Sequence, residues 1–238
     1  MDPEKNQIAG GKMADNSGEV SDESQIILVD KPAGMSSFGV VAKVRGYLRA
    51  KYGHKVKVGH TGTLDPFATG LLILLTGKMT KRSDEFLKKD KVYEATLRLG
   101  YTSSTGDPEG EIFKLSDIRP ELGDIESTLQ HFTGTIIQKV PVFSAVKING
   151  ERAYKLARKG VDFETPSRQV TIYAIEVLSY NYPKLVIRCH VSSGTYIRTL
   201  AEDIGEALGT GAYLTALRRL KVADYSVEDA QKLAEFVV

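Results

Sequence analysis

A loop rich in glycine and threonine, residues 59–70, surrounds a single carboxylate, Asp65. Pro66 restricts the backbone directly after that carboxylate, and the glycines of the loop allow unusual backbone angles and close approach of a ligand. Its threonines, Thr63 among them, supply hydroxyl groups. Such a loop can hold one ionised carboxylate in a defined place, as a nucleophile or a base. A structural turn, with Asp65 accepting local backbone hydrogen bonds, is the open alternative.

A second candidate is Arg198, which follows a strand and a glycine turn in the segment Ser192–Thr199. The spacing places Arg198 in the first turn of a helix, where a cation is electrostatically unfavourable. Its placement therefore indicates a specific anionic partner, either a carboxylate held bidentately or a phosphate. The alternative is a surface ion pair with Glu202, four residues further along the helix.

A third candidate is Tyr93, in the strand-like run Lys91–Glu94. An aromatic residue on a strand is most often part of the core. The functional alternative is an aromatic face on which a nucleic-acid base stacks.

Several other kinds of site are excluded by spacing. Gly70 and the Gly77-Lys78 pair fail the spacing of a phosphate-binding loop, because Met79 follows the lysine. No GxGxxG fingerprint or Gly-x-Ser-x-Gly nucleophile elbow is present. The 4 histidines and 1 cysteine lack metal-ligand spacing. We therefore expect neither a metal nor a cofactor.

Composition sets the broad class. A chain of 238 residues with 42% hydrophobic residues can bury a sizeable core. It has no apolar run near the roughly 20 residues that span a bilayer, and Cys189 has no partner for an internal disulfide. Net charge is +2, but acidic residues are concentrated in residues 1–25, so the remainder is mildly basic and compatible with a polyanionic partner. We expect a soluble cytoplasmic protein.

The elements that must position the candidate residues can be read from periodicity. Residues 1–25 are polar and acidic, and we interpret them as a disordered leader or tag before one domain at 26–238. The pattern predicts strands at 26–29, 56–58, 71–76, 91–100, 142–148, 168–180, 185–192 and 213–225. It predicts helices from Ser37, as the cap, to Gly53, and at 124–132, 151–159 and 196–208, with a last helix capped by Ser226.

The order of these elements predicts the fold class. Strands outnumber helices and often follow one another directly, and Asn149-Gly150 is typical of a hairpin turn. This favours an α+β fold with a mixed, largely antiparallel sheet flanked by helices.

Five segments, in order along the chain, resemble the motifs of the TruB family of RNA pseudouridine synthases. Together they extend over about residues 26–220 and comprise Asp30–Ser37, Gly59–Gly70, Lys91–Tyr93 with Arg98–Gly100, Pro141–Lys147 and Ser193–Leu200. The resemblance implies the pseudouridine synthase fold, with a central active-site cleft. It also implies isomerisation of uridine to pseudouridine in RNA.

The resemblance also implies a role for each candidate. Asp65 would be the catalytic carboxylate, either attacking C1′ of the ribose or removing the C2′ proton. Tyr93 would stack on the target base and assist proton removal from C5, and Arg198 would pair with Asp65 and keep it ionised.

Four further residues are implied as substrate-binding. His60 would hold the RNA loop once the uridine is flipped out, and Lys31 would support the active-site loop. Thr63 lies in the motif Gly59–Gly70 and Tyr196 in the motif Ser193–Leu200, and both would contact the substrate.

The implied partner is tRNA, with uridine 55 of the T-loop as the target. Phe67-Ala68 resembles the bacterial stand-alone branch rather than the guide-RNA-dependent branch. TruB proteins commonly continue into a C-terminal RNA-binding domain. Because only 18 residues follow Leu220, we expect that domain to be lacking and the catalytic domain to contact RNA alone, as a monomer.

Alternatives from other functional classes stay open. One is a tRNA-folding chaperone that uses the same loop and basic surface, and another is a pseudouridine synthase acting on a different RNA. A glycoside hydrolase would need a second carboxylate, for which Glu202 or Asp203 is the candidate.

Overall fold

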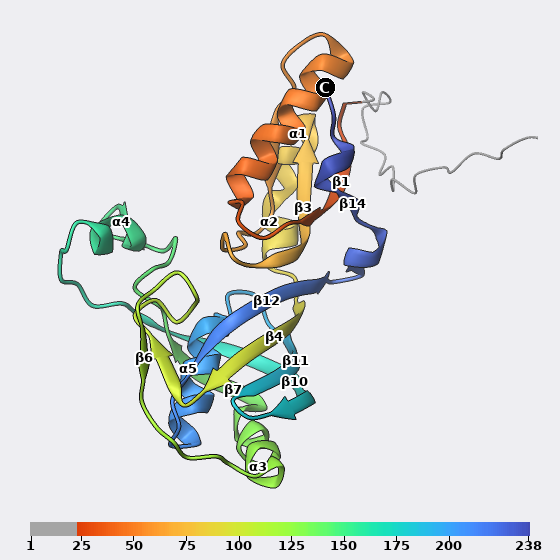
Figure 1. Cartoon of the computed structure of the whole chain (residues 1–238). Coiled ribbons are helices and arrows are strands. Elements are labelled where there is room, and N and C mark those ends of the chain that lie inside the picture. The colour runs from red at the N-terminus through yellow and green to blue at the C-terminus, as the bar shows by residue number, and fades with distance from the viewer. Residues whose placement is uncertain (1–22) are drawn as a thin grey trace, which may run out of the picture. The chain divides into compact units, whose positions relative to one another are not determined.

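The computed structural model describes residues 23–238, which form two compact units. One unit holds the described residues up to Leu87 together with Ser226–Val238, and the other holds Lys88–Tyr225. We call them the terminal unit and the central unit (Figure 1). The predicted leader lies almost entirely outside the described residues, so the domain limits 26–238 stay a prediction.

The terminal unit is a small sheet with one long helix. Its strands are β1 (Ile26–Lys31), β2 (Val58–His60), β3 (Thr69–Thr76) and β14 (Gln231–Lys232), and its helices are α1 (Ser37–Tyr52) and α2 (Ser83–Leu87). Short 3₁₀ turns lie at Gly77–Arg82, Val227–Asp229 and Leu233–Glu235. Strand β3 pairs antiparallel with β1 and β2, and β14 pairs parallel with β1.

Helix α1 lies along the sheet because its apolar residues recur at helical spacing (Figure 1). Its valines and Leu48 are buried against β1 and β3. Gly53 ends the helix in the left-handed conformation at φ 76°, as predicted, and its N–H donates to the Arg49 carbonyl. The cap itself is Ser36, whose side chain accepts from the Gly39 N–H, so the prediction of Ser37 as the cap was wrong.

The central unit is a five-stranded sheet in the order β12-β4-β11-β10-β7, with every pairing antiparallel. These strands are β4 (Lys91–Leu99), β7 (Gly134–Lys139), β10 (Ser167–Asn181), β11 (Lys184–Val191) and β12 (Ala212–Val222). The shorter strands are β5 (Tyr101–Ser103), β6 (Ile112–Lys114), β8 (Lys147–Ile148), β9 (Glu151–Arg152) and β13 (Tyr225–Ser226). The helices are α3 (Leu122–Phe132), α4 (Ala153–Arg158) and α5 (Ile197–Ala207).

Helix α5 contacts β12 and also α3, which packs on β10. Gly205 allows the close approach, since a Cβ there would lie 2.2 Å from the Ala212 backbone nitrogen. The helix stops before Gly209, as predicted, which takes a φ of 66°. The described residues therefore confirm the predicted class, a mixed and largely antiparallel sheet with helices.

Two predicted elements were wrong. Only Lys147–Ile148 of the predicted strand 142–148 is a strand, because the carbonyls before it accept hydrogen bonds from partners outside any sheet. The predicted helix after Ser226 is a single 3₁₀ turn. Ser226 does cap it, accepting from the Glu228 N–H, but Gln231 then pairs with Val29 of β1, so the chain cannot remain helical.

Candidate active site

The loop that carries Asp65 connects two paired strands of the terminal unit. Strand β2 ends at His60, which is paired with Leu74, and β3 begins at Thr69. Leu64 and Ala68 are buried and anchor the loop on both sides of Asp65, which is half-buried. The Ala68 N–H donates to the Asp65 carbonyl at 3.1 Å, closing a tight turn. The loop is therefore a fixed structure with its carboxylate near the surface.

Ser37 fixes the backbone directly before Asp65. Its hydroxyl accepts a hydrogen bond from the Leu64 N–H at 2.8 Å and donates one to the Leu64 carbonyl at 3.0 Å. Ser37 is only 2% exposed, so water cannot replace it. Since Ser37 belongs to the first turn of α1, the loop takes its position from that helix.

Lys31 fixes the backbone directly after Asp65. It is fully buried, and its ammonium donates to the carbonyls of Pro32, Met35 and Pro66 at 2.9, 2.6 and 3.1 Å. The Pro66 carbonyl also accepts from the Gly34 N–H at 2.8 Å. These contacts are those of a residue that supports the loop, while a contact between Lys31 and substrate stays a prediction. We call Lys31 and Ser37, which bind the backbone on the two sides of Asp65, the loop clamp.

His60 and Thr63 lie on the same loop. The Gly62 N–H donates to Nδ1 of His60 at 3.4 Å, so this nitrogen acts as the acceptor. The imidazole is half-buried, whereas Thr63 is exposed. The terminal unit therefore brings Lys31, His60, Thr63 and Asp65 together on one loop and its support.

Arg198 lies in the first turn of α5 in the central unit and is 5% exposed. Its guanidinium lies 3.3 Å from the carboxylate of Asp107 and donates to the carbonyls of Thr105 and Phe143 at 3.0 and 2.7 Å. The surface ion pair with Glu202, weighed as an alternative, is therefore not the arrangement. The predicted pairing of Arg198 with Asp65 stays a prediction.

Asp107 is the residue that the sequence reasoning missed. It is 4% exposed, and its carboxylate accepts from the Thr105 hydroxyl at 2.6 Å and from the Glu109 N–H at 3.0 Å. The available signal was the dipeptide Asp107-Pro108, which repeats the Asp65-Pro66 pattern within a polar loop. Charge-assisted contacts of this kind hold Arg198 in one orientation.

Two half-buried carboxylates, Glu202 and Asp203, lie on α5. Burial raises the pKa of Glu202 to about 7, although Arg198 opposes this shift. Burial, with a contribution from the neighbouring Glu206 charge, raises the pKa of Asp203 to about 6. Glu202 packs on Gly106, where an added Cβ would lie 2.7 Å from its carboxylate oxygen. Arg198 therefore lies near two carboxylates, those of Asp107 and Glu202.

Tyr93 lies on β4, near the middle of the central sheet, and is 8% exposed. Its cross-strand partners are Cys189 on β11 and Arg219 on β12. Lys91 is on the same buried face, and its pKa is lowered to about 8 by burial first and by the Arg219 charge second. This face of the sheet thus joins an aromatic ring to cationic groups, which an apolar core would not need.

Tyr196 directly precedes α5. Its backbone N–H donates to the side-chain oxygen of Gln138 at 2.7 Å, and its carbonyl accepts from the same amide at 3.0 Å. The guanidinium of Arg168 lies over its ring, 5.1 Å from the ring centre. The central unit therefore presents Tyr93, Tyr196 and Arg198 from β4 and from the start of α5.

No group of residues among 23–238 has the composition of a metal site. Within the same part of the chain, no helix is long and apolar enough to cross a membrane. Each unit therefore carries its own candidate groups: the terminal unit a loop with one carboxylate, and the central unit an arginine and two tyrosines.

Comparison with known proteins decides the family. Residues 49–197 match the family model described as TruB family pseudouridylate synthase, N-terminal domain. The chain belongs to the TruB family. Residues 198–237 match the model of the tRNA pseudouridylate synthase B C-terminal domain. In this TruB chain those residues form α5 and β12 of the central unit and the C-terminal part of the terminal unit. Membership makes the protein an isomerase of the pseudouridylate synthase type.

The similar sequences carry the name tRNA pseudouridine synthase B. The protein of Phocaeicola vulgatus is 49% identical over 90% of this TruB chain and 92% of its own length. That of Burkholderia lata is 46% identical over 87% of the chain, which spans 63% of that relative. The aligned part of this chain thus spans most of one bacterial relative and slightly less than two thirds of another.

Solved structures show the same fold. A Cbf5-Nop10-Gar1 complex contains a chain that is 31% identical with a TM-score of 0.66, covering 88% of this chain and 52% of that one. A chain in an H/ACA RNP bound to a substrate RNA containing 2′-deoxyuridine is 26% identical with a TM-score of 0.65, covering 92% of this chain and 59% of that one. This TruB chain therefore shares its fold with one chain in each of these two structures.

Proposed function

We propose that this protein converts uridine 55 in the T-loop of tRNA to pseudouridine, with Asp65 as the catalytic carboxylate. The observation that carries the proposal is the loop clamp. Ser37 and Lys31 bind the backbone of Leu64 and Pro66, the residues on either side of Asp65. A carboxylate fixed from both sides is preorganised for catalysis, because little reorganisation is needed when the substrate arrives.

The reaction breaks the N1–C1′ bond of the nucleotide and forms a C5–C1′ bond, while a proton passes from C5 and N1 becomes protonated. No oxidant, phosphate donor or metal enters this balance. Asp65 begins the reaction in one of two ways: it attacks C1′ to form a covalent intermediate, or it removes the proton from C2′. Both routes require an ionised carboxylate.

The remaining residues act on the base and on Asp65. The target uridine leaves the stack, which costs a few kcal/mol, and stacks on the ring of Tyr93. Arg198, oriented by Asp107, pairs with Asp65 and keeps it ionised. His60, Thr63 and Tyr196 contact the loop nucleotides.

The choice of tRNA is supported by the named relatives. The bacterial tRNA pseudouridine synthases are 46% and 49% identical, whereas the chains from the Cbf5-Nop10-Gar1 complex and the H/ACA RNP are 31% and 26% identical. Phe67-Ala68 after Asp65-Pro66 fits the same branch. We place the protein in the cytoplasm as a monomer.

The test uses an unmodified T-arm stem-loop with wild type, Asp65→Asn and, as matched control, Asp84→Asn. Asp84 is an exposed aspartate of the same unit, on α2. Pseudouridine is read from carbodiimide-dependent primer-extension stops. The expected result is a stop at the T-loop uridine with wild type and Asp84→Asn only. RNA binding without a stop in any of the three would favour the chaperone function or another RNA.

A further inference from the structure

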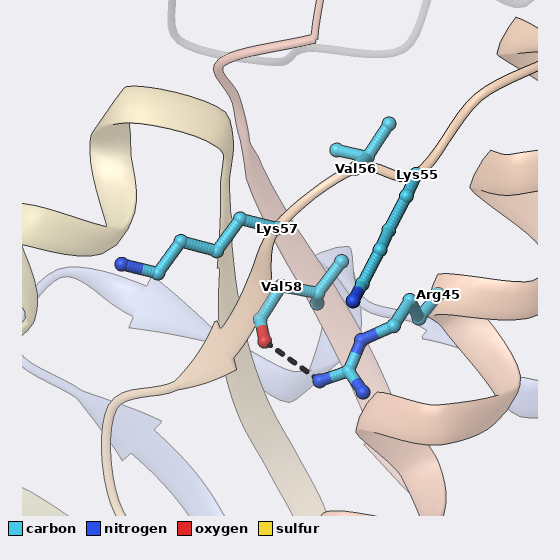
Figure 2. A pocket seen from close by; sticks show the side chains of 5 residues that line it. All are labelled: Arg45, Lys55, Val56, Lys57 and Val58. Carbon is cyan, nitrogen blue, oxygen red and sulfur yellow. Dashed lines mark hydrogen bonds between the residues drawn. The ribbon is translucent and has the colours of Figure 1, made fainter.

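A hollow in the terminal unit is lined mainly by cations. It has a volume of about 320 Å³ and lies between α1 and the segment that enters β2. Its lining consists of Arg45, Lys55, Val56, Lys57 and Val58 (Figure 2). No carboxylate is among these residues.

Within residues 23–238, no acidic side chain forms an ion pair with Arg45, Lys55 or Lys57, the three cations of the hollow. The Lys55 ammonium nevertheless points toward the Arg45 guanidinium, while Lys57 extends along the other side of the strand (Figure 2). Like charges repel, so an arrangement that gathers them without an acid favours a bound anion.

Arg45 is held in place for such an anion. One terminal nitrogen donates to the Val58 carbonyl at 3.2 Å, and the guanidinium lies 5.8 Å from the ring centre of Phe38. The planar guanidinium fork suits phosphate oxygens, and fixing it beforehand lowers the entropy lost on binding. Phe38 is 65% exposed, so it adds an aromatic surface next to the cation. Cations beside exposed aromatics are typical of single-stranded nucleic-acid surfaces.

We propose that Arg45, Lys55 and Lys57 form a phosphate anchor for the RNA backbone, separate from the residues that act on the uridine. The proposal rests on the proposed function for the identity of the RNA. Strand β2 runs from this anchor to the loop of Asp65: Lys57 precedes His60 by three residues, about 10 Å of extended chain. The anchor would hold backbone phosphates near the target nucleotide and fix its register.

The test measures RNA binding as a function of salt. Binding of the T-arm stem-loop and of a full-length unmodified tRNA is followed from 50 to 300 mM KCl for wild type, Lys55→Gln/Lys57→Gln and Arg45→Gln. Lys43→Gln is the matched control, because Lys43 is an exposed cation of α1 outside the hollow. Each lost phosphate contact reduces the steepness of the negative slope of log K against log salt by about 0.7–0.9. We expect the slope of the double variant to be less steep by about 1.5, for two lost contacts, and the slope of Lys43→Gln to equal that of wild type.

Pseudouridine formation over a range of RNA concentrations provides the second measurement. The anchor predicts that the double lysine variant, whose side chains are exposed, requires a higher RNA concentration than wild type to reach its maximal single-turnover rate. A smaller slope with the full tRNA alone would place the bound phosphates outside the T-arm and overturn the anchor as a contact near the target nucleotide. An unchanged slope and affinity with both RNAs would overturn it, even where wild type forms pseudouridine. No pseudouridine with wild type, together with a reduced slope in the variant, would instead overturn the proposed function and leave the anchor standing.

Discussion

The hydroxyl of Ser37 forms two hydrogen bonds with the backbone of Leu64, accepting from its N–H and donating to its carbonyl. Helix α1 is thereby connected to the residue that precedes the catalytic candidate. Ser36, its neighbour, caps the same helix and does not contact the loop through any hydrogen bond in the described structure. Of the two adjacent serines, Ser36 therefore caps helix α1, and Ser37 holds the backbone of the Asp65 loop.

Ser37→Ala is expected to lower the free energy of unfolding by about 1–3 kcal/mol, because two buried backbone groups lose their partner. It should also reduce the single-turnover rate of pseudouridine formation, because Asp65 loses its fixed position. Urea unfolding and rapid-quench kinetics measure the two effects. Ser36→Ala is the control: losing a helix cap costs about 1 kcal/mol, and the rate should stay as in wild type. Equal rates for both variants would contradict a positioning role for Ser37.

Asp107→Ala is expected to lower the free energy of unfolding by about 3–5 kcal/mol, since it removes one partner of a buried ion pair with Arg198. Asp107→Asn keeps the shape and should lose less stability, but should still reduce the rate through a less constrained Arg198. Urea titration and single-turnover rates are the measurements.

Asp117→Asn is the matched control for that experiment. Asp117 forms an exposed ion pair with Lys114 near the surface, where salt and water screen the interaction. Stability and rate should both match wild type. If Asp117→Asn and Asp107→Ala were equally mild, the buried pair would not orient Arg198.

Glu202 makes stability depend on pH. Its pKa is raised from 4.5 to about 7, so the folded state holds the proton more tightly than the unfolded chain does. Stability should therefore fall as pH rises from about 4.5 to about 7 and remain lower above that range. Glu202→Gln removes the contribution of this residue, while that of Asp203 remains. The free energy of unfolding of the variant, relative to that of wild type, should therefore rise by about 1–2 kcal/mol between pH 5 and pH 8. Urea midpoints at four pH values test this, and a constant difference between the two proteins would contradict it.

Two features favour glycine at position 106: the left-handed backbone conformation and the closeness of the Glu202 side chain. It has a φ of 73°, and a Cβ would lie 2.7 Å from Glu202 Oε1. Gly106→Ala should destabilise by about 1–3 kcal/mol, measured by thermal or urea unfolding. Gly160→Ala is the matched control, because Gly160 has a similar φ of 69° with nothing near the added Cβ. The control should lose less stability, and equal losses would show that the contact with Glu202 has no effect.

Much of the architecture follows from local sequence. Helix α1 was predicted because its apolar residues recur at helical spacing and Gly53 ends it, and the paired strands β10 and β11 because long runs rich in strand-forming residues flank a turn. The Asp65 loop was found because glycine, threonine and proline have special backbone or hydrogen-bonding properties that are visible in one sequence.

Tertiary structure decided the rest, because hydrogen bonds between distant segments carry no local signal. Ser36 and Ser37 are identical in type, and only the nearby Leu64 backbone determines which one caps α1. Val142–Val146 has strand-like composition, but the Phe143 carbonyl accepts a hydrogen bond from the distant Arg198, and the carbonyls of Ser144 and Val146 accept from the N–H groups of Tyr154 and Ala153 at the start of α4. Asp107 was unremarkable within a polar loop until folding brought it, 91 residues before Arg198, into a buried ion pair. Residue type thus determined which groups were able to react, and packing between distant segments determined which groups hold them in place.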